Sequence, residues 1–160
     1  MLPQPPQNRI SKRALPVWRI TGTIITLFLL ILLAGFIFLS NLFNWPIWIS
    51  ITAIILFLLF AYIDIYLVPK LRWKHWRYEV REQEIEIQSG IFVIKRTLVP
   101  MVRVQHVDTE QGPLLRKYNL ATVTISTAAT VHGIPAIDVE EAEEMRHAIS
   151  RLARVAEEDV

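Results

Sequence analysis

The chain has 160 residues, enough for one ordinary domain or for a membrane anchor with a small domain attached. Hydrophobic residues make up 52% of it and concentrate between residues 17 and 68, where only Arg19 and Asp64 carry a charge at pH 7, which excludes a single water-soluble core. The net charge is +2, but residues 70–160 contain 13 basic and 14 acidic residues, which argues against nucleic acid as a partner. The absence of cysteine excludes disulfides, thiolate metal sites and cysteine nucleophiles.

The apolar region predicts a two-helix transmembrane hairpin over residues 17–69, preceded by a basic cytoplasmic tail of residues 1–16. The first helix is expected at about 17–39. Within it, residues 20–39 carry no charge and as a helix span roughly 30 Å, the thickness of the hydrocarbon core. A cleaved signal peptide also begins with basic residues followed by an apolar run. This apolar run is too long for a signal peptide, and no small-x-small cleavage site follows it.

The second helix of the hairpin is expected at about 46–68, with Pro46 in its first turn and Pro69 ending it. The turn at residues 40–44 carries no charge, whereas basic residues flank both spans, so the positive-inside rule places both termini in the cytoplasm. The sequence thus predicts a multi-pass protein of the cell membrane. Besides the hairpin, a membrane collar is expected to contact lipid, and it consists of Arg9, Lys12, Arg13, Lys70, Arg72, Trp73, Lys74, Trp76 and Arg77.

Arg19 and Asp64 lie within the apolar region, where a charge is costly unless it is paired or reaches the interface. Both lie near the expected cytoplasmic ends of the helices. Counted at the rise of an α-helix from those ends, their depths in the membrane differ by about 3 Å. One hypothesis is an ion pair that fixes the rotation of the two helices. The other is that each side chain reaches the interface on its own.

From Arg77 onward the hydrophobic period changes to two, which predicts a cytoplasmic β-rich domain over residues 70–156. Asp138 and Glu141 form a capping-box pattern that predicts the start of an amphipathic C-terminal helix, before an acidic tail at 157–160. The expected fold class is α+β, in which the hairpin precedes a split β-barrel or sandwich capped by that helix. Short turns separate the expected strands at residues 78–80, 85–87, 92–99, 102–108, 121–127 and 131–137.

This order of elements, together with one stretch of sequence, resembles the bacterial pleckstrin-homology (PH) domains of the YdbS-like membrane proteins. The resemblance covers about residues 17–152. It implies a PH-like split barrel, closed by the C-terminal helix and tethered under the bilayer, in a family without an established enzymatic activity. The stretch reads Val-Pro-Met-Val-Arg-Val-Gln-His-Val-Asp at residues 99–108, and it continues through Gln111-Gly112-Pro113-Leu114, Arg116, Leu120-Ala121-Thr122 and Ser126-Thr127-Ala128.

Two positions depart from the pattern of this family, because Asn119 and Ala129 stand where glycine is expected. Asn119 can still adopt the left-handed conformation that such a turn needs.

The resemblance also implies a kind of partner, namely membrane proteins that contain several such domains.

The sequence predicts no catalytic, cofactor-binding or metal site and no enzymatic activity. It has no nucleotide-binding motif and no nucleophile elbow, and its four histidines lack metal-binding spacing. His106 and Asp108 could share one strand face, but a third ligand is missing. A row of carboxylates alternates with isoleucines, which predicts the solvent face of a strand rather than paired catalytic acids, and the row consists of Glu79, Glu82, Glu84 and Glu86.

The preferred functional hypothesis is an interaction or scaffold subunit that assembles with itself or with a larger membrane protein containing several PH domains. Alternation along residues 102–105 is expected to turn Val102 and Val104 inward and the polar residues outward. A structural alternative is that two arginines, Arg103 and Arg116, tie the sheet to the Gly112-Pro113 loop through buried hydrogen bonds. The candidate interface consists of Arg103, Gln105, His106, Asp108 and Arg116.

The other functional hypothesis is the sensing of anionic lipid headgroups at the inner leaflet. The loop expected at residues 81–84 reads Arg-Glu-Gln-Glu, and its carboxylates would repel a phosphate group. General attraction of the collar to anionic lipid remains, worth about 1 kcal/mol per basic residue near the surface.

Overall fold

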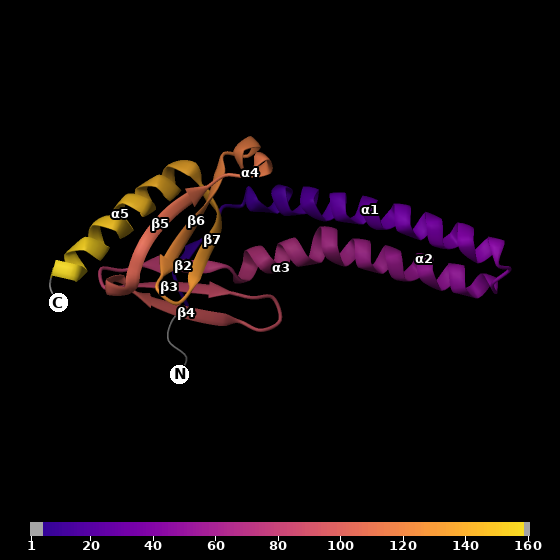
Figure 1. The fold of residues 1–160 in the computed structure, drawn as a ribbon, viewed down its shortest axis with the longest axis horizontal. Helices are drawn as coiled ribbons and strands as arrows, with labels where there is room; N and C mark the ends of the chain where they lie inside the picture. Colours follow the sequence, from indigo (N-terminus) through magenta and orange to yellow (C-terminus); the bar gives the residue numbers. More distant parts are fainter. Residues whose placement is uncertain (1–4, 159–160) are drawn as a thin grey trace. The chain divides into compact units, whose positions relative to one another are not determined.

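A computed structural model describes residues 5–158, and the chain divides into two compact units. One unit is a helical hairpin over residues 15–71. The other joins the residues before Leu15 to those from Arg72 onward. Figure 1 shows the paired helices of the first unit and the two sheets of the second.

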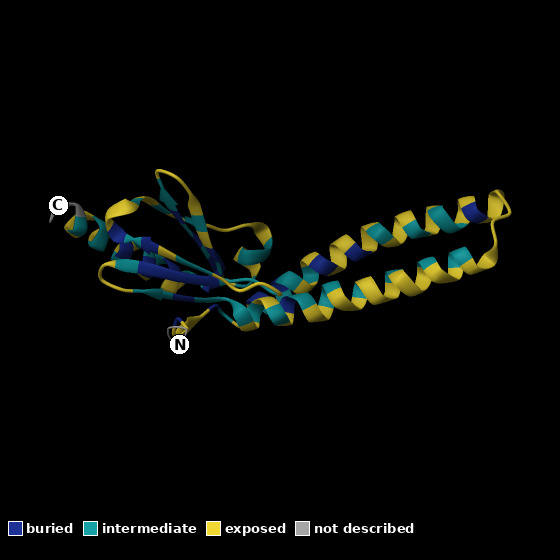
Figure 2. Ribbon diagram, turned by 90° about the horizontal axis from the view of Figure 1, so that it is seen from below, coloured by how far each residue is buried: buried dark blue, intermediate teal, exposed yellow. Residues whose placement is uncertain are grey.

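The helical unit consists of two antiparallel helices, as the sequence predicts, and each is long and apolar enough to cross a membrane. The first is α1 (Ala14–Leu42). The second is continuous through α2 (Ile47–Tyr62), a π-helical turn η1 (Ile63–Leu67) and α3 (Val68–His75). Most of their large apolar side chains are exposed (Figure 2), as expected of side chains that face lipid.

The second helix continues through Pro69 to His75, so the expectation that Pro69 ends it is wrong. Proline lacks the N–H that would bond to residue 65, and its ring clashes with that carbonyl in a regular α-helix. The π-helical turn lies immediately before it, and there the Val68 N–H bonds to the Ile63 carbonyl. This wider turn accommodates the proline ring without ending the helix.

The other unit contains two antiparallel sheets, and these confirm the expected fold class. The first sheet has the order β1-β2-β3-β4 and the second the order β5-β6-β7, while α5 packs on β5, β6 and η2. The elements are β1 (Asn8–Arg9), β2 (Arg77–Val80), β3 (Glu84–Ser89), β4 (Lys95–Pro100), η2 (Met101–Arg103), β5 (Val104–Glu110), α4 (Pro113–Lys117), β6 (Leu120–Thr127), β7 (Val131–Asp138) and α5 (Val139–Glu158).

Residues 5–14 of the N-terminal segment, which the sequence predicts to be a tail, belong to the folded domain, and residues 1–4 lie outside the described part of the chain. Asn8 and Arg9 form β1 and pair with the start of β2. The Ser11 N–H then donates to the Ala136 carbonyl of β7 at 3.1 Å, so this segment connects the two sheets. Because β1 has only two residues, it shows no hydrophobic alternation, and the sequence pattern therefore does not predict this strand.

The core lies between the sheets and α5. Tyr78, Ile85, Ile125, Ile134 and Ile149 are fully buried, and they come from β2, β3, β6, β7 and α5. At these five positions the alternation of the strands and the three-to-four spacing of the helix identify the inward face.

The helix start differs in detail from the predicted capping box. Asp138 directly precedes α5, but its Oδ1 accepts hydrogen bonds from Ser11 Oγ at 3.2 Å and from Arg13 Nη1 at 3.4 Å. Glu141 Oε1 accepts the Tyr78 hydroxyl instead of a backbone N–H. Both carboxylates are thus used to join segments that are distant in the sequence.

Two predicted strands begin later than expected. β4 starts at Lys95 rather than at residue 92, because Gly90, with a φ of 125°, turns the chain and leaves residues 91–94 in a loop. Val102 lies in a 3-10 turn and is 50% exposed, so its predicted inward orientation is wrong. Met101 takes the core position in its place and is fully buried.

Candidate functional site

The five candidate interface residues are all exposed at the protein surface. Arg103 ends η2, Gln105, His106 and Asp108 lie in β5, and Arg116 lies in α4. Within residues 5–158, none of these side chains makes a hydrogen bond or an ion pair. The alternative in which Arg103 and Arg116 form buried hydrogen bonds to the Gly112-Pro113 loop is therefore wrong.

The structure does not gather the five residues into one cluster. A bulge in β5 lies between Val104 and His106, and beyond it His106 pairs with Ser126 and Asp108 with Thr124. These two side chains share one face of the three-stranded sheet. Arg103 and Gln105 instead line a groove together, while Arg116 lies apart on the short helix α4.

The groove lies between the end of β4, η2 and the loop that joins β6 to β7, and its volume is about 470 Å³. Arg103, Gln105 and His132 supply polar groups, and Leu98 and Val102 supply apolar ones. Its lining consists of Leu98, Val99, Pro100, Val102, Arg103, Gln105, Thr127, Ala128, Ala129, Thr130 and His132. One wall is β4, an edge strand of the first sheet. Such a groove offers hydrogen bonds and apolar contacts to an extended segment.

The β6–β7 loop forms one wall of the groove and is held by its own threonines. The Thr127 N–H and Oγ1 both donate to the Thr130 carbonyl, at 2.9 and 2.8 Å. Thr130 Oγ1 lies 2.9 Å from His132 Nε2. These bonds close the turn without a left-handed residue at Ala129, so the glycine of the family pattern is not needed there.

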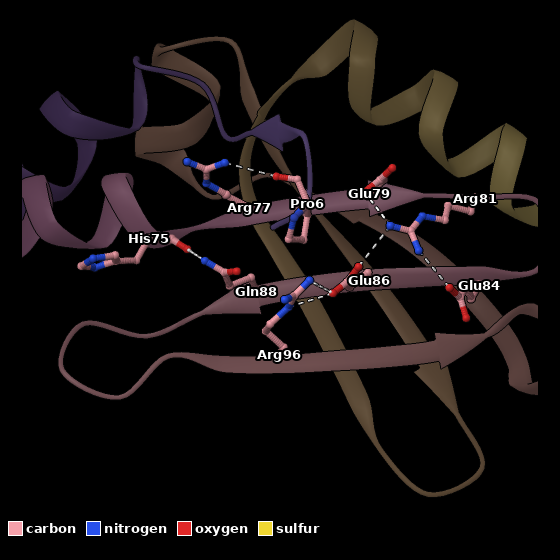
Figure 3. Close-up of polar contacts among 9 residues, drawn as sticks. All are labelled: Pro6, His75, Arg77, Glu79, Arg81, Glu84, Glu86, Gln88 and Arg96. Atoms are coloured by element: carbon pink, nitrogen blue, oxygen red, sulfur yellow. Dashed lines mark hydrogen bonds and ion pairs between the residues drawn. The ribbon is translucent and has the colours of Figure 1, made fainter. Parts of the chain in front are cut away.

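The acidic strand β3 carries a network of ion pairs instead of a free row of carboxylates (Figure 3). Glu86 is only 8% exposed, and its Oε1 accepts from Arg96 Nε at 2.8 Å. Arg81 contacts Glu79 at 3.0 Å, Glu84 at 3.1 Å and Glu86 at 3.4 Å. The prediction of a solvent-facing row is therefore wrong for Glu86.

This network also changes the charge of the loop between β2 and β3. The hydrogen bond from Arg81 lowers the pKa of Glu79 below its ordinary value. Arg81 is surrounded by three carboxylates, so its charge is already balanced within the protein. The loop accordingly offers no unbalanced cation to a phosphate group.

Three collar residues, Arg9, Trp73 and Arg77, make contacts within the domain unit. Arg9 stacks over the Trp73 ring at 5.7 Å, and Trp73 Nε1 donates to the Ile10 carbonyl at 3.1 Å. Arg77 Nη1 donates to the Pro6 carbonyl at 3.4 Å (Figure 3). These contacts hold the N-terminal segment next to the start of β2. Other collar side chains, Lys12, Lys70, Arg72 and Lys74, are exposed.

The hypothetical Arg19–Asp64 ion pair does not form in the structure. The Arg19 guanidinium lies over the Tyr66 ring at 5.6 Å. Asp64 packs against Gly22, where a Cβ atom would lie 3.1 Å from both the Asp64 carbonyl oxygen and Oδ2. Gly22 is almost one helical turn beyond Arg19, which explains why the two charges do not meet.

The close approach of the two helices at Gly22 leaves polar atoms enclosed. Asp64 Oδ2 and Thr26 Oγ1 are buried and have no hydrogen-bond partner among the described residues. The sequence contained a signal for this contact, since Gly22 interrupts an apolar run and small residues let membrane helices approach closely.

Comparison with known proteins places this arrangement in a family. A family model described as Bacterial PH domain matches residues 20–153. The UPF0699 transmembrane protein YdbS of Bacillus subtilis (strain 168) is 57% identical over 155 residues, which cover 97% of this chain and 98% of that protein. The UPF0699 transmembrane protein YdbT of the same organism is 29% identical over 83 residues, covering 49% of this chain and 17% of that protein.

No solved structure matches the chain. The bacterial PH family model is consistent with the two apolar helices, the antiparallel sheets and the C-terminal helix described above, and the relative that matches over almost the whole length is named a transmembrane protein. The chain is a membrane protein with two candidate transmembrane helices, and it belongs to the bacterial PH domain family.

Proposed function

We propose that this protein is a membrane-tethered interaction subunit whose groove at Arg103 and Gln105 receives a partner protein. The observation that carries the proposal is the state of Arg103, an exposed guanidinium without a hydrogen-bond partner in the described chain, at the rim of a partly apolar groove. The fold does not use this charge internally. An arginine in such a place is suited to binding a carboxylate or a carbonyl of another chain.

The proposed partner is either a second copy of this chain or a larger membrane protein that contains related domains. The similarity to YdbT supports the second choice, because it is confined to 17% of that protein and thus to one segment of a much longer chain. Tethering both partners to one membrane would raise their effective concentration, so a modest groove can support a stable complex. The proposed role is binding rather than catalysis.

Headgroup sensing has less support from the structure. The charge of Arg81 in the β2–β3 loop is balanced by three carboxylates, and Arg77 donates to the chain's own backbone. The exposed lysines near the membrane remain available for general attraction to anionic lipid. That attraction strengthens anchoring without selecting a headgroup.

An Arg103→Glu variant tests the proposal. The tagged full-length chain is purified in detergent from its native membrane, and bound proteins are quantified. We expect the unchanged chain to retain a stoichiometric partner and Arg103→Glu to lose it, because the reversed charge repels the partner's acceptor. Arg151→Glu, at an exposed arginine of α5, is the matched control and should retain the partner.

Thermal unfolding of both variants shows whether they remain folded. Retention of the partner by a folded Arg103→Glu variant would contradict the proposed groove. A monomer that binds anionic liposomes through its domain, with no protein partner, would favour headgroup sensing instead.

A further inference from the structure

The tip of the β3–β4 hairpin exposes consecutive apolar side chains. Phe92, Val93 and Ile94 are 93%, 80% and 53% exposed, whereas most large apolar residues of this unit belong to the core. Three such residues together at the end of a hairpin form an apolar tip, and contiguous apolar surface of this kind marks a contact with another protein or with a membrane.

Gly90 gives this tip a defined shape. Its φ is +125°, and a Cβ atom built there would lie 1.9 Å from the Val93 carbonyl oxygen. No side chain fits at this position, because the backbone of Val93 folds back over Gly90. The turn therefore holds Phe92 and Val93 at its outer end, away from the core.

The tip extends from the end of the sheet at which the chain leaves the second apolar helix. β2 begins at Arg77, two residues after that helix ends at His75. Arg77 pairs with Gln88, and the Gln88 amide donates to the His75 carbonyl at 3.3 Å (Figure 3). Gln88 in turn pairs with Arg96 and Ser89 with Lys95, so β3 and β4 extend one pair past the start of β2, and residues 90–94 project beyond this end of the sheet. Since a strand rises about 3.3 Å per residue, the tip is within a few residues' length of the helix end.

We propose that this tip inserts into the headgroup and upper acyl-chain region of the bilayer. The lipid bilayer is the occupant because the two apolar helices tether the domain to one and the tip lies at the tethered end of the sheet. Two lysines are exposed in this region: Lys95 directly follows the tip, and Lys74 lies in the last turn of the second helix. Apolar side chains flanked by lysines suit the surface of an anionic membrane.

This insertion would give the domain a second attachment besides the apolar helices and so restrict its orientation at the membrane. It is independent of the proposed partner groove, which lies at the other end of β4 and next to the β6–β7 loop.

The absence of cysteine makes a clean test possible. Full-length Phe92→Cys is labelled with the fluorophore NBD and reconstituted into nanodiscs of phosphatidylcholine and phosphatidylglycerol. We expect the emission of this label to lie at shorter wavelength than the emission of the same dye in aqueous buffer without detergent. We also expect it to be quenched by lipids that carry a nitroxide near the headgroup. The control is Glu82→Cys in the β2–β3 loop, an exposed residue at the opposite end of β3, whose label should show neither effect.

A second pair of variants removes the contribution of the label itself. The first variant carries the label at Ile94→Cys. The second carries the same label together with the substitutions Phe92→Asp and Val93→Asp. The proposal requires the emission to return to the aqueous value and the quenching to be lost, while thermal unfolding stays unchanged. A label at position 92 that behaves like the one at position 82 would overturn the proposal. So would a shielded label that lipid nitroxides do not quench, because another copy of the chain would then cover the tip.

Discussion

Tyr78 shows how a single residue connects distant parts of this fold. Its side chain is 1% exposed, and its hydroxyl donates to Glu141 Oε1 of α5 at 2.5 Å. Burial, followed by the hydrogen bond and the negative charge of Glu141, raises the pKa of Tyr78 above its ordinary value of 10.0. The folded protein therefore holds this proton more tightly than the unfolded chain does.

This shift predicts a loss of stability at alkaline pH. Its contribution is fully present below pH 10 and declines as the pH rises above 10, because only the unfolded chain then gains by ionising. Tyr78→Phe should lower the free energy of unfolding by about 1.5–3 kcal/mol at pH 8. It should also weaken the decline above pH 10, as measured by denaturant unfolding at several pH values. An equally steep decline in Tyr78→Phe would contradict the assignment.

Some residue-level features could be predicted from sequence and others could not. Asn119 adopts a φ of 59°, which confirms the predicted left-handed turn, because side-chain size and polarity alone make asparagine suitable there. Val102 is exposed where alternation predicts burial, because a 3-10 turn shifts the face that each residue presents. The exposure of Arg103 was predictable, but its groove was not, since the other wall comes from β6 and β7.

At the scale of elements, the two helices of the hairpin approach each other closely at one glycine. Asp64, at the start of the π-helical turn, packs against Gly22 of α1. Helical rise predicts that Asp64 lies near the level of Arg19, but the residue that Asp64 packs against is Gly22, one helical turn further on. It measures depth along a helix, whereas the contact depends on which faces of the two helices meet.

Gly22→Val is expected to destabilise the hairpin. The new Cβ would lie 3.1 Å from backbone and side-chain oxygens of Asp64, a tight contact to which the Asp64 backbone must adjust, and we expect a cost of about 1–3 kcal/mol. Gly35→Val is the matched control, because no atom lies within 4 Å of a Cβ at that position of the same helix. Thermal unfolding in detergent should show a lower midpoint for Gly22→Val than for Gly35→Val. Equal midpoints would show that Gly22 is not a packing contact.

The strands were predictable from sequence to different degrees. β3 and β6 have clear alternation in sequence, and β3, β6 and β7 all lie where the pattern predicts strands. β1 is too short to show a period, and it forms only because the N-terminal segment returns to pair with β2. That return depends on contacts between residues more than sixty positions apart, such as Trp73 with Ile10, which a local pattern cannot show.

At the scale of the whole molecule, the chain combines two candidate transmembrane helices with a bacterial PH domain. Composition alone indicated this division, because apolar residues fill one segment and alternating ones another. The cytoplasmic location of both termini remains a prediction from the basic flanks of the hairpin. Function was less accessible, because the domain carries no motif of a known reaction and its groove joins residues from separate hairpins.

Site-specific photo-crosslinking in the native membrane would show whether the proposed groove binds a protein partner there. A benzophenone amino acid replaces Gln105 in the groove or, as the control, Glu140 on the exposed side of α5. We expect one dominant crosslink from position 105, to a second copy or to a larger membrane protein with related domains, and none from position 140. Crosslinks only to lipid from position 105, or equal protein crosslinks from both positions, would contradict the proposal.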